Sequence, residues 1–331
     1  MNFELNKDCK CLIATPVSHL TAVVQYLNLN KDFFTLNENA NSKNLIKSFV
    51  NDKKLKYIFI NPNAQGYFLG AELLSKLNLK GINTCSTGTN HIDLDYCIQN
   101  NILLTSLKND LELINKLPST SELAFCLMQC LNRKILMCNS QVIDDLIWDY
   151  RNVMGNQLAG QTVGCLGYGR LGKIFCTQLE GFDVKIKVCD NDEKVYIPKK
   201  YKKVDIDELF SSCNSVAIHI HSNPQNINLV NDKLLGNTLK NFILVNTSRG
   251  DICDENAIAK RIKNGQMGGY GTDVLTTEFT NIKKSPILQA ALEKKYNIII
   301  TPHVGGMTYE GQTKAFLYAL KKFKIKNSNR V

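Results

Sequence analysis

The sequence of 331 residues lacks the features that define several classes of protein. No run of apolar residues reaches 18, so we expect no helix that crosses a membrane. The first residues lack the basic segment and apolar core of a secretory leader, which favours a cytoplasmic location. The twelve cysteines include no Cys-x-x-Cys pair and no spacing typical of a zinc site, so no metal is predicted. Several cysteines lie in apolar runs, as expected of small core residues in a reducing compartment.

The sequence also lacks a concentrated basic stripe, although its net charge is +10. Its 40 basic and 30 acidic residues are mixed along the chain, with small lysine clusters such as those at 199–203 and 321–326. A nucleic-acid surface would require basic residues interleaved with aromatic residues. We therefore predict no nucleic-acid partner, and we interpret the excess charge as a solvated surface that could attract anionic small molecules.

What is present is the pattern of a two-domain α/β protein. The apolar content of 44% and charged content of 21% are ordinary for a globular chain, and the length allows two cores. Strand-like and helix-like stretches alternate over residues 10–104 and again over 163–300, which predicts parallel, doubly wound sheets. The longest helical pattern, 119–138, is apolar almost all round and can be capped by Ser119 or Thr120. We expect it to form one buried helix.

The stretch TVGCLGYGRLGKIFCTQLEGFDVKIKVCD, at 162–190, has the order strand, tight turn, helix, strand and acid. Its three glycines follow the pattern G-x-G-x-x-G: Gly167 for a sharp turn, Gly169 for close approach to a pyrophosphate and Gly172 for packing of the helix on the strand. The start of the helix offers N–H groups to phosphate. Asp190 follows Gly172 by 18 residues (190 − 172), where a carboxylate suits ribose hydroxyls and repels a 2′-phosphate. The pattern predicts NAD as the cofactor; the alternative is an ordinary glycine turn.

Three polar residues, Arg249, Glu278 and His303, fall at or after the ends of later strands, where open α/β sheets bind ligands. Arginine can hold a carboxylate by two parallel bonds, and histidine can exchange a proton near neutral pH. A glutamate on the far ring nitrogen would orient the histidine and favour its charged form. Taken singly, each residue could instead form a structural ion pair, cap an element or be solvated. Sequence alone does not show that the three meet.

Five longer segments join these residues, and with them the sequence resembles the D-isomer-specific 2-hydroxyacid dehydrogenases, a family that includes D-3-phosphoglycerate dehydrogenase. The resemblance covers almost the whole chain, and 29 residues separate Arg249 from Glu278 (278 − 249), as the family pattern requires. In order, the segments are similar to the family's substrate loop, the start of its interdomain helix, its cofactor turn, its arginine-to-glutamate segment and its histidine segment: STGTNHIDLDYC, STSELAF, LAGQTVGCLGYGRLGK, LVNTSRGDICDENAIAKRIKNGQMGGYGTDVLTTE and TPHVGGMTYEG.

The resemblance implies two doubly wound parallel-sheet domains with a discontinuous boundary. Residues 1–115 and 305–331 would form a flavodoxin-like substrate domain, and residues 116–304 a Rossmann NAD-binding domain. The family usually dimerises through the cofactor domain, so a homodimer of that kind is expected.

The resemblance also assigns roles to individual residues. Arg249 would bind the carboxylate and keto oxygen of the substrate, and His303 would be the acid/base with Glu278 as its partner. The backbone N–H groups of Thr87 and Gly88 would hold the substrate carboxylate. The residues at the cofactor would be Gly167, Gly169, Arg170, Leu171, Gly172, Asp190, Ile220, His221, Thr247, Ser248, Asp273, Gly305 and Gly306.

The function implied is hydride transfer between NAD(H) and a pair made of a D-2-hydroxy acid and its 2-keto acid. A D-3-phosphoglycerate dehydrogenase, a reductase of glyoxylate, hydroxypyruvate or lactate type, and a non-catalytic NAD-sensing protein of the same fold are the alternatives. The loop 61–65 lacks the arginine that phosphoglycerate enzymes tend to carry, which argues against a phosphorylated substrate. His221 replaces a usual proline, Phe279 replaces the proline that usually follows the glutamate, and Glu278 stands where the formate branch has an amide, so formate is not expected.

Overall fold

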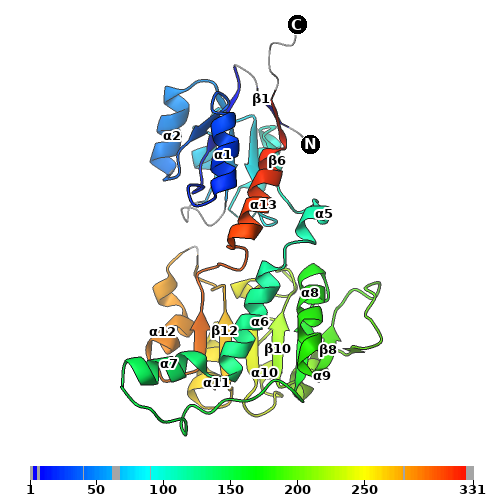
Figure 1. Cartoon of the computed structure of the whole chain (residues 1–331). Coiled ribbons are helices and arrows are strands. Elements are labelled where there is room, and N and C mark those ends of the chain that lie inside the picture. Colours follow the sequence, from blue (N-terminus) through cyan, green and yellow to red (C-terminus); the bar gives the residue numbers. More distant parts are fainter. Residues whose placement is uncertain are drawn as a thin grey trace. The chain divides into compact units, whose positions relative to one another are not determined.

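The computed structural model describes residues 3–5, 8–39, 41–61, 68–89, 91–278 and 280–325. The chain divides into two compact units, one of Met1–Leu117 with Met307–Val331 and one of Pro118–Gly306. Each unit contains a parallel sheet with helices, which confirms the predicted α/β class (Figure 1). No helix of the described residues is both long and apolar enough to span a bilayer.

The first unit is built on a five-stranded parallel sheet in the order β3-β2-β4-β5-β6. Counted along its own strands this order is 2-1-3-4-5, the flavodoxin-like arrangement. A second, two-stranded sheet pairs the two ends of the unit in parallel, with Phe3 opposite Phe323. The strands are β1 (Phe3–Leu5), β2 (Lys10–Ile13), β3 (Phe34–Leu36), β4 (Leu55–Ile60), β5 (Gly81–Thr84), β6 (Leu103–Thr105) and β14 (Phe323–Ile325).

Helices cover both faces of this sheet and bury a separate core on each. Val23 of α1 and Phe316 of α13 belong to one core, together with Phe59 of the sheet. Leu45 of α2 and Leu73 of α3 belong to the other. The helices are α1 (Thr21–Leu29), α2 (Ser42–Asn51), α3 (Ala71–Leu74), α4 (Leu94–Gln99), α5 (Leu111–Ile114) and α13 (Tyr309–Leu320).

The second unit has a seven-stranded parallel sheet in the order β13-β12-β11-β10-β7-β8-β9. The strand order reverses between β7 and β10, which are paired directly, and ligands bind α/β sheets at such a switch point. The strands are β7 (Thr162–Leu166), β8 (Lys185–Cys189), β9 (Lys202–Lys203), β10 (Ser215–Ile218), β11 (Ile243–Asn246), β12 (Gly269–Thr272) and β13 (Ile298–Ile300).

This sheet, too, carries a core on each face. Phe210 of α9 and Ile258 of α11 pack in one core, and Leu127 of α6 and Phe175 of α8 pack in the other. The helices are α6 (Ser119–Asn132), α7 (Ile135–Ile143), α8 (Arg170–Leu179), α9 (Ile206–Ser212), α10 (Asp232–Leu235), α11 (Glu255–Lys263) and α12 (Pro286–Leu292), with single turns at η1 (Glu180–Phe182), η2 (Gly250–Ile252) and η3 (Ile282–Lys284).

The expectation of one buried helix over 119–138 is wrong. The pattern divides into α6 and α7 at Lys134, whose φ of +51° is left-handed. The Asn132 carbonyl accepts the N–H of Asn156 over 2.8 Å, and a Cβ on Gly155 would lie 2.3 Å from that oxygen. The returning chain therefore takes the acceptor that a continuing helix would use. α6 is buried along one side and not all round, with Pro118 instead of Ser119 or Thr120 at its N-cap position, and α7 contains no buried residue.

Candidate active site

The glycine turn connects β7 to α8, as the sequence predicts. Gly167 has a φ of +97°, and a Cβ there would lie 2.7 Å from Ile220 and 2.8 Å from the His219 carbonyl carbon. A Cβ on Gly172 would lie 2.0 Å from the Gly167 carbonyl oxygen, so a side chain at either position would disrupt the turn. By contrast, a Cβ added to Gly169 would have no described atom within 4 Å, so the backbone of Gly169 is open to a ligand.

Asp190 follows β8 and lies beside this turn. Its Oδ2 accepts the Tyr168 N–H over 2.6 Å, and its Oδ1 accepts the Asp192 N–H over 2.9 Å. Each carboxylate oxygen can accept more than one hydrogen bond, so the group retains acceptor capacity for hydroxyls. The acid predicted from spacing alone is thus held against the turn by the turn's own backbone.

The groups around the turn fit a dinucleotide. Arg170 is the first residue of α8, where a cation is unfavourable to the helix dipole and a bound anion would offset it. Burial lowers the pKa of Arg170, which an adjacent pyrophosphate would counteract. Thr247, after β11, is buried, and its Oγ1 has no partner among the described residues. A buried hydroxyl of that kind is costly unless a ligand or water satisfies it.

The remaining residues predicted at the cofactor lie in the first turn of α8 or after the ends of neighbouring strands of the same unit. The Leu171 carbonyl accepts the Ser121 hydroxyl over 2.9 Å, which ties α8 to α6. The Ser248 hydroxyl donates to the Ile218 carbonyl at the end of β10 over 2.8 Å. The His221 carbonyl accepts an amide N–H of Asn226 over 2.6 Å. Gly305 lies against Asp273, because a Cβ added to Gly305 would be 3.0 Å from Asp273 Oδ2. A Cβ added to Gly306 would have no described atom within 4 Å.

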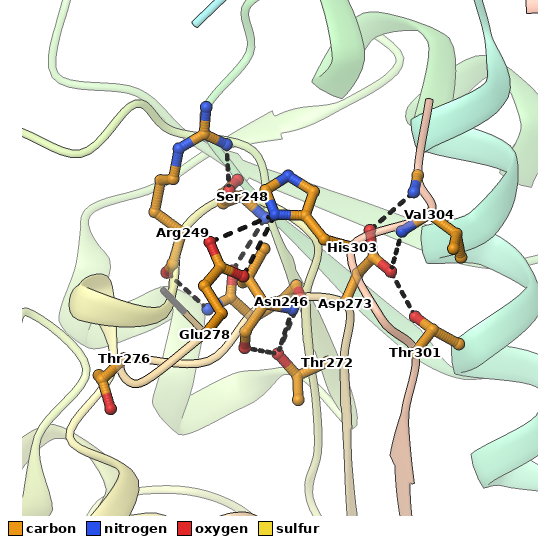
Figure 2. A network of polar contacts seen from close by, with 12 residues as sticks. Asn246, Ser248, Arg249, Thr272, Asp273, Thr276, Glu278, Thr301, His303 and Val304 are labelled. Atoms are coloured by element: carbon orange, nitrogen blue, oxygen red, sulfur yellow. Dashed lines mark hydrogen bonds and ion pairs between the residues drawn. The ribbon is translucent and has the colours of Figure 1, made fainter. Parts of the chain in front are cut away.

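Arg249 sits on a turn that Asn246 holds in shape. Asn246 ends β11, is fully buried, donates from Nδ2 to the Arg249 carbonyl over 2.9 Å and accepts the Ser248 N–H over 3.0 Å. The Arg249 guanidinium donates to the Ser248 carbonyl over 2.6 Å (Figure 2). The backbone carrying the arginine is therefore fixed by a buried side chain that the sequence did not single out.

Asp273 follows β12 and organises the segment that carries the histidine. Its Oδ1 accepts the Thr301 hydroxyl over 2.5 Å and the Val304 N–H over 2.8 Å, and its Oδ2 accepts the Gly305 N–H over 2.7 Å (Figure 2). The Asp273 carbonyl accepts the His303 N–H over 2.9 Å. Burial raises the pKa of Asp273, although these hydrogen bonds oppose that effect. Asp273 thus fixes the backbone on both sides of His303.

The side chains of His303 and Glu278 lie in contact. This pairing was expected from the family resemblance and not from the residues alone. The His303 Nδ1 lies 3.2 Å from each carboxylate oxygen of Glu278 (Figure 2). The side chains are 29% and 16% exposed, so the pair is partly shielded but remains open to a small molecule. His303 has a left-handed φ of +55°, a conformation that non-glycine residues adopt rarely and often at functional sites. Because Nδ1 faces the carboxylate, Nε2 is the ring nitrogen placed for proton exchange.

The loop predicted to hold a carboxylate lies in the first unit, after β5. The Ser86 hydroxyl donates to the Gly88 carbonyl over 2.6 Å, the Thr84 hydroxyl lies 2.9 Å from Ser86 Oγ, and His91 Nε2 lies 3.3 Å from Thr84 Oγ1. Burial lowers the pKa of His91 to about 4. A neutral His91 can donate to Thr84, which donates to Ser86 in turn. This chain of donors fixes the backbone on both sides of Thr87.

Several residues that build the site were not identified from the sequence. They share one property: each is a buried or half-buried polar side chain that forms a hydrogen bond within the site, as Asn246, Thr301, Thr84 and His91 do. Asn246 gave the only available signal, since asparagine at a strand end often folds the following turn. Two expectations rest on positions 62–65 and Phe279, which lie outside the described residues. Within the described part of the chain, no group of three or more His, Cys, Asp or Glu side chains could hold a metal.

Comparison with known proteins agrees with this geometry. Residues 125–305 match the family model described as D-isomer specific 2-hydroxyacid dehydrogenase, NAD binding domain. The chain is 28% identical to human D-3-phosphoglycerate dehydrogenase over 71% of its own length and 42% of that protein's, so it spans less than half of that relative. It is 27% identical to glyoxylate reductase of Thermococcus litoralis, over 71% of this chain and 70% of that one.

Among solved structures, a D-lactate dehydrogenase from Aquifex aeolicus in complex with NAD and lactic acid shares the fold, with a TM-score of 0.76 and 24% identity over 94% of this chain and 93% of that one. The family match covers more than half of the sequence and includes the glycine turn, Arg249, Glu278 and His303. The chain therefore belongs to the D-isomer specific 2-hydroxyacid dehydrogenase family and contains its NAD-binding domain.

Proposed function

We propose that this protein is an NAD-dependent oxidoreductase that interconverts a 2-keto acid and a D-2-hydroxy acid. The observation that carries the proposal is the His303–Glu278 pair, in the unit that also holds Arg249 and the dinucleotide turn. An imidazole backed by a carboxylate is the acid/base that reduction of a keto group and oxidation of an alcohol both require. The family relationship makes hydride transfer the reaction to expect.

NADH held at the glycine turn of Gly167, Gly169 and Gly172 would supply the hydride that reduces C2 of the keto acid. Arg249, which stays charged, would bind the substrate carboxylate and polarise the keto oxygen. The protonated His303 would donate the Nε2 proton to that oxygen as negative charge develops there. Glu278 would balance the charge of the imidazolium and hold Nε2 in position. In oxidation His303 would take the same proton back.

We assign the substrate domain to the first unit and the cofactor domain to the second. The N–H groups of Thr87 and Gly88, on the loop fixed by Ser86 and His91, would bind the substrate carboxylate. At the cofactor, Arg170 and Leu171 would meet the pyrophosphate, Asp190 the adenosine ribose, Ile220 and His221 the adenosine side, and Thr247, Ser248, Asp273, Gly305 and Gly306 would complete the site.

The substrate we favour is a small, unphosphorylated keto acid of the glyoxylate, hydroxypyruvate or lactate type. No arginine or lysine occurs at residues 61–65, where the family's phosphoglycerate enzymes tend to carry an arginine. Phosphohydroxypyruvate, the keto acid of the phosphoglycerate pair, is the principal alternative, because human D-3-phosphoglycerate dehydrogenase is among the relatives.

The test is oxidation of NADH, followed by absorbance, with glyoxylate, hydroxypyruvate, pyruvate, phosphohydroxypyruvate and bulkier keto acids. Turnover of an unphosphorylated acid that His303→Ala abolishes would support the proposal. If phosphohydroxypyruvate is the best substrate, the inference from the loop is wrong. If the protein binds NADH tightly and turns over nothing, the enzymatic proposal fails.

We also propose a homodimer formed through the cofactor domain. The arm made of α7 and residues 144–154 carries large apolar side chains that are mostly exposed, among them Leu146 at 87%, Trp148 at 90% and Tyr150 at 73%. A group of exposed, large apolar side chains is typical of an interface. The family pattern favours a second copy of this chain as the partner. Light scattering of the protein and of Trp148→Glu should give a dimer for the first and a monomer for the second. A monomeric parent protein would refute this proposal.

We place the protein in the cytoplasm. All twelve cysteines are free thiols, including the buried Cys11, Cys165 and Cys253, which suits a reducing compartment.

A further inference from the structure

One buried acidic residue has no place in the mechanism above. Glu255 begins α11 and is 4% exposed; among the described residues the only other buried acid is Asp273. Two neutral donors contact its carboxyl group, and no cation of the described residues pairs with it. Burying such a group is costly, and an apolar residue of similar size would often be no less stable. The position of Glu255 therefore suggests a function other than stability.

The two hydrogen bonds of Glu255 reach the two ends of one segment. Its Oε1 accepts the Thr276 N–H over 2.7 Å, and its Oε2 accepts the Ser285 hydroxyl over 2.6 Å. Ser285 also caps α12, because its Oγ accepts the Leu288 N–H over 3.2 Å. A single carboxyl group thus holds both ends of the segment 276–285: Thr276, which follows β12 by four residues (276 − 272), and Ser285, which directly precedes α12.

This segment carries Glu278, two residues after Thr276 and seven before Ser285. It also passes directly against the Arg249 turn. A Cβ on Gly250 would lie 2.3 Å from the Leu275 carbonyl carbon and 2.4 Å from the Thr276 nitrogen. The same short stretch of backbone therefore connects the positions of Arg249 and Glu278, and Glu255 holds that stretch in place.

The contact between Glu278 and His303 is sensitive to such support. Both carboxylate oxygens lie 3.2 Å from Nδ1, at the long end of the range for an N–H···O hydrogen bond. A small outward drift of the segment would break both contacts, and displacements of about 1 Å in a site of this kind can reduce a rate about a hundredfold.

We propose that Glu255 is a positioning residue that sets the distance between Glu278 and His303. The inference rests on the proposed function, since it concerns the same acid/base pair. Glu255 acts through the Thr276 N–H and the Ser285 hydroxyl, and we assign it no contact with the substrate or the cofactor. Loss of its carboxyl group is expected to release Glu278 from His303 while both residues remain present.

The experiment compares Glu255→Ala, Glu255→Gln and Glu278→Gln by keto-acid reduction at several pH values. We expect Glu255→Ala to lower kcat at least tenfold, to leave the KM for NADH unchanged and to alter the pH profile in the same direction as Glu278→Gln. Glu255→Gln should keep most of the activity, because an amide oxygen can still accept the Thr276 N–H. In the double variant, Glu255→Ala should add little to the loss caused by Glu278→Gln.

Asp254→Ala provides the matched control. Asp254 caps the same helix by accepting the Asn256 and Ala257 N–H groups, over 3.0 and 3.1 Å, so its loss loosens that end of α11 without touching the segment 276–285. It should lower Tm and leave kcat and the pH profile unchanged. The proposal is wrong if Glu255→Ala behaves as Asp254→Ala does, or if its effect multiplies with that of Glu278→Gln.

A protein that turns over no keto acid would refute the proposed function, but it would leave the positioning role of Glu255 to be tested by another measurement. The ring ¹⁵N resonances of His303 then report on the contact directly. Glu278→Gln and Glu255→Ala should shift them alike, and an unchanged signal in Glu255→Ala would overturn the proposal.

Discussion

Both units fix the loops of the proposed site with polar side chains, but the groups that they fix differ in chemistry. Each presents loops beyond the ends of a parallel sheet, and each fixes a loop with buried polar side chains. In the second unit the supporting groups are Asn246, Asp273 and Glu255, and the supported residues, Arg249, Glu278 and His303, are ionisable. In the first unit a chain of neutral donors supports backbone N–H groups. We infer that the second unit supplies the charged groups and proton transfer, and that the first unit contributes uncharged backbone donors to substrate binding.

Each unit also contains one histidine whose ring nitrogens are shielded from solvent, although only His91 is buried as a whole residue. His219 follows β10 and packs on Phe175, with ring centroids 4.9 Å apart, and neither ring nitrogen has a partner among the described residues. His91 is bonded to Thr84. Burial lowers the pKa of His219 to about 3 and that of His91 to about 4. The two rings are both neutral at pH 7, but only one is part of a polar network.

The largest expected effect comes from removing the proton donor of the second unit. His303→Asn should lower kcat about a thousandfold, within the roughly 10²–10⁴-fold contribution of acid/base catalysis. Asparagine is chosen because it tolerates the left-handed φ of this position better than alanine. The measurement is steady-state keto-acid reduction, with NADH binding by fluorescence as the control. Activity close to that of the parent protein would remove His303 from the mechanism.

Arg249→Lys should have the next largest effect, because lysine keeps the charge but cannot bind a carboxylate through two parallel bonds. A hydrogen bond to a charged group contributes about 1.5–3 kcal/mol, so kcat/KM should fall about 10–100-fold. Keto-acid kinetics at saturating NADH measure this. An unchanged kcat/KM would indicate that the guanidinium does not hold the substrate.

Thr84→Val tests the first unit in the same assay. Valine is similar in shape but breaks the donor chain from His91 to Ser86, which loosens the loop of Thr87 and Gly88. The loss of a neutral hydrogen bond, about 1 kcal/mol, should raise the KM for the keto acid about fivefold and leave kcat nearly unchanged. A large loss of kcat with an unchanged KM would contradict the division between binding and proton transfer.

The smallest expected effects are changes in the free energy of unfolding, which should differ between variants of His219 and His91. Because the folded-state pKa of each lies below the ordinary value of 6.5, the unfolded chain binds a proton between pH 6.5 and about 4 that the folded chain does not. The free energy of unfolding should therefore fall as pH is lowered through that range. His219→Phe should reduce this fall and should not destabilise the protein at pH 7, since its ring nitrogens form no bonds.

His91→Phe is the matched variant in the first unit. It should also reduce the acid-dependent fall, but it should destabilise the protein by about 1 kcal/mol at pH 7 because Thr84 loses a partner. Urea unfolding at pH 7 and pH 5 measures both variants. Equal behaviour of the two at pH 7 would show that the hydrogen bond of His91 contributes nothing.

Local patterns allowed much of this to be predicted from the sequence. One turn and its two strands determine which residues can occupy positions 167, 172 and 190. Spacing alone therefore identified Gly167, Gly172 and Asp190. The alternation of strands and helices likewise sufficed for the α/β class. Resemblance, not spacing, joined Arg249, Glu278 and His303. Glu278 and His303, 25 residues apart (303 − 278), meet only through the packing of the sheet.

What could not be predicted depends on distant contacts. The break at Lys134 arises because Asn156 and Gly155 return to the end of α6, more than 20 residues later. The pairing of Phe3 with Phe323 joins opposite ends of the sequence. Glu255 looks like an ordinary acid in the first turn of a helix, and its burial depends on Ser285, 30 residues further along the chain. Periodicity and propensity contain no information about such partners.

Following the hydride from NADH to the product shows whether the protein is a D-specific dehydrogenase. The protein is incubated with NADH deuterated at both hydrogen positions of the nicotinamide C4 and with a keto acid whose product is chiral, such as pyruvate or hydroxypyruvate. The product is analysed by chiral chromatography and mass spectrometry. For the proposed mechanism we expect deuterium on C2 of a hydroxy acid of D configuration, formed about a thousandfold more slowly by His303→Asn. A product of L configuration, a product without deuterium, or unimpaired formation by His303→Asn would contradict it.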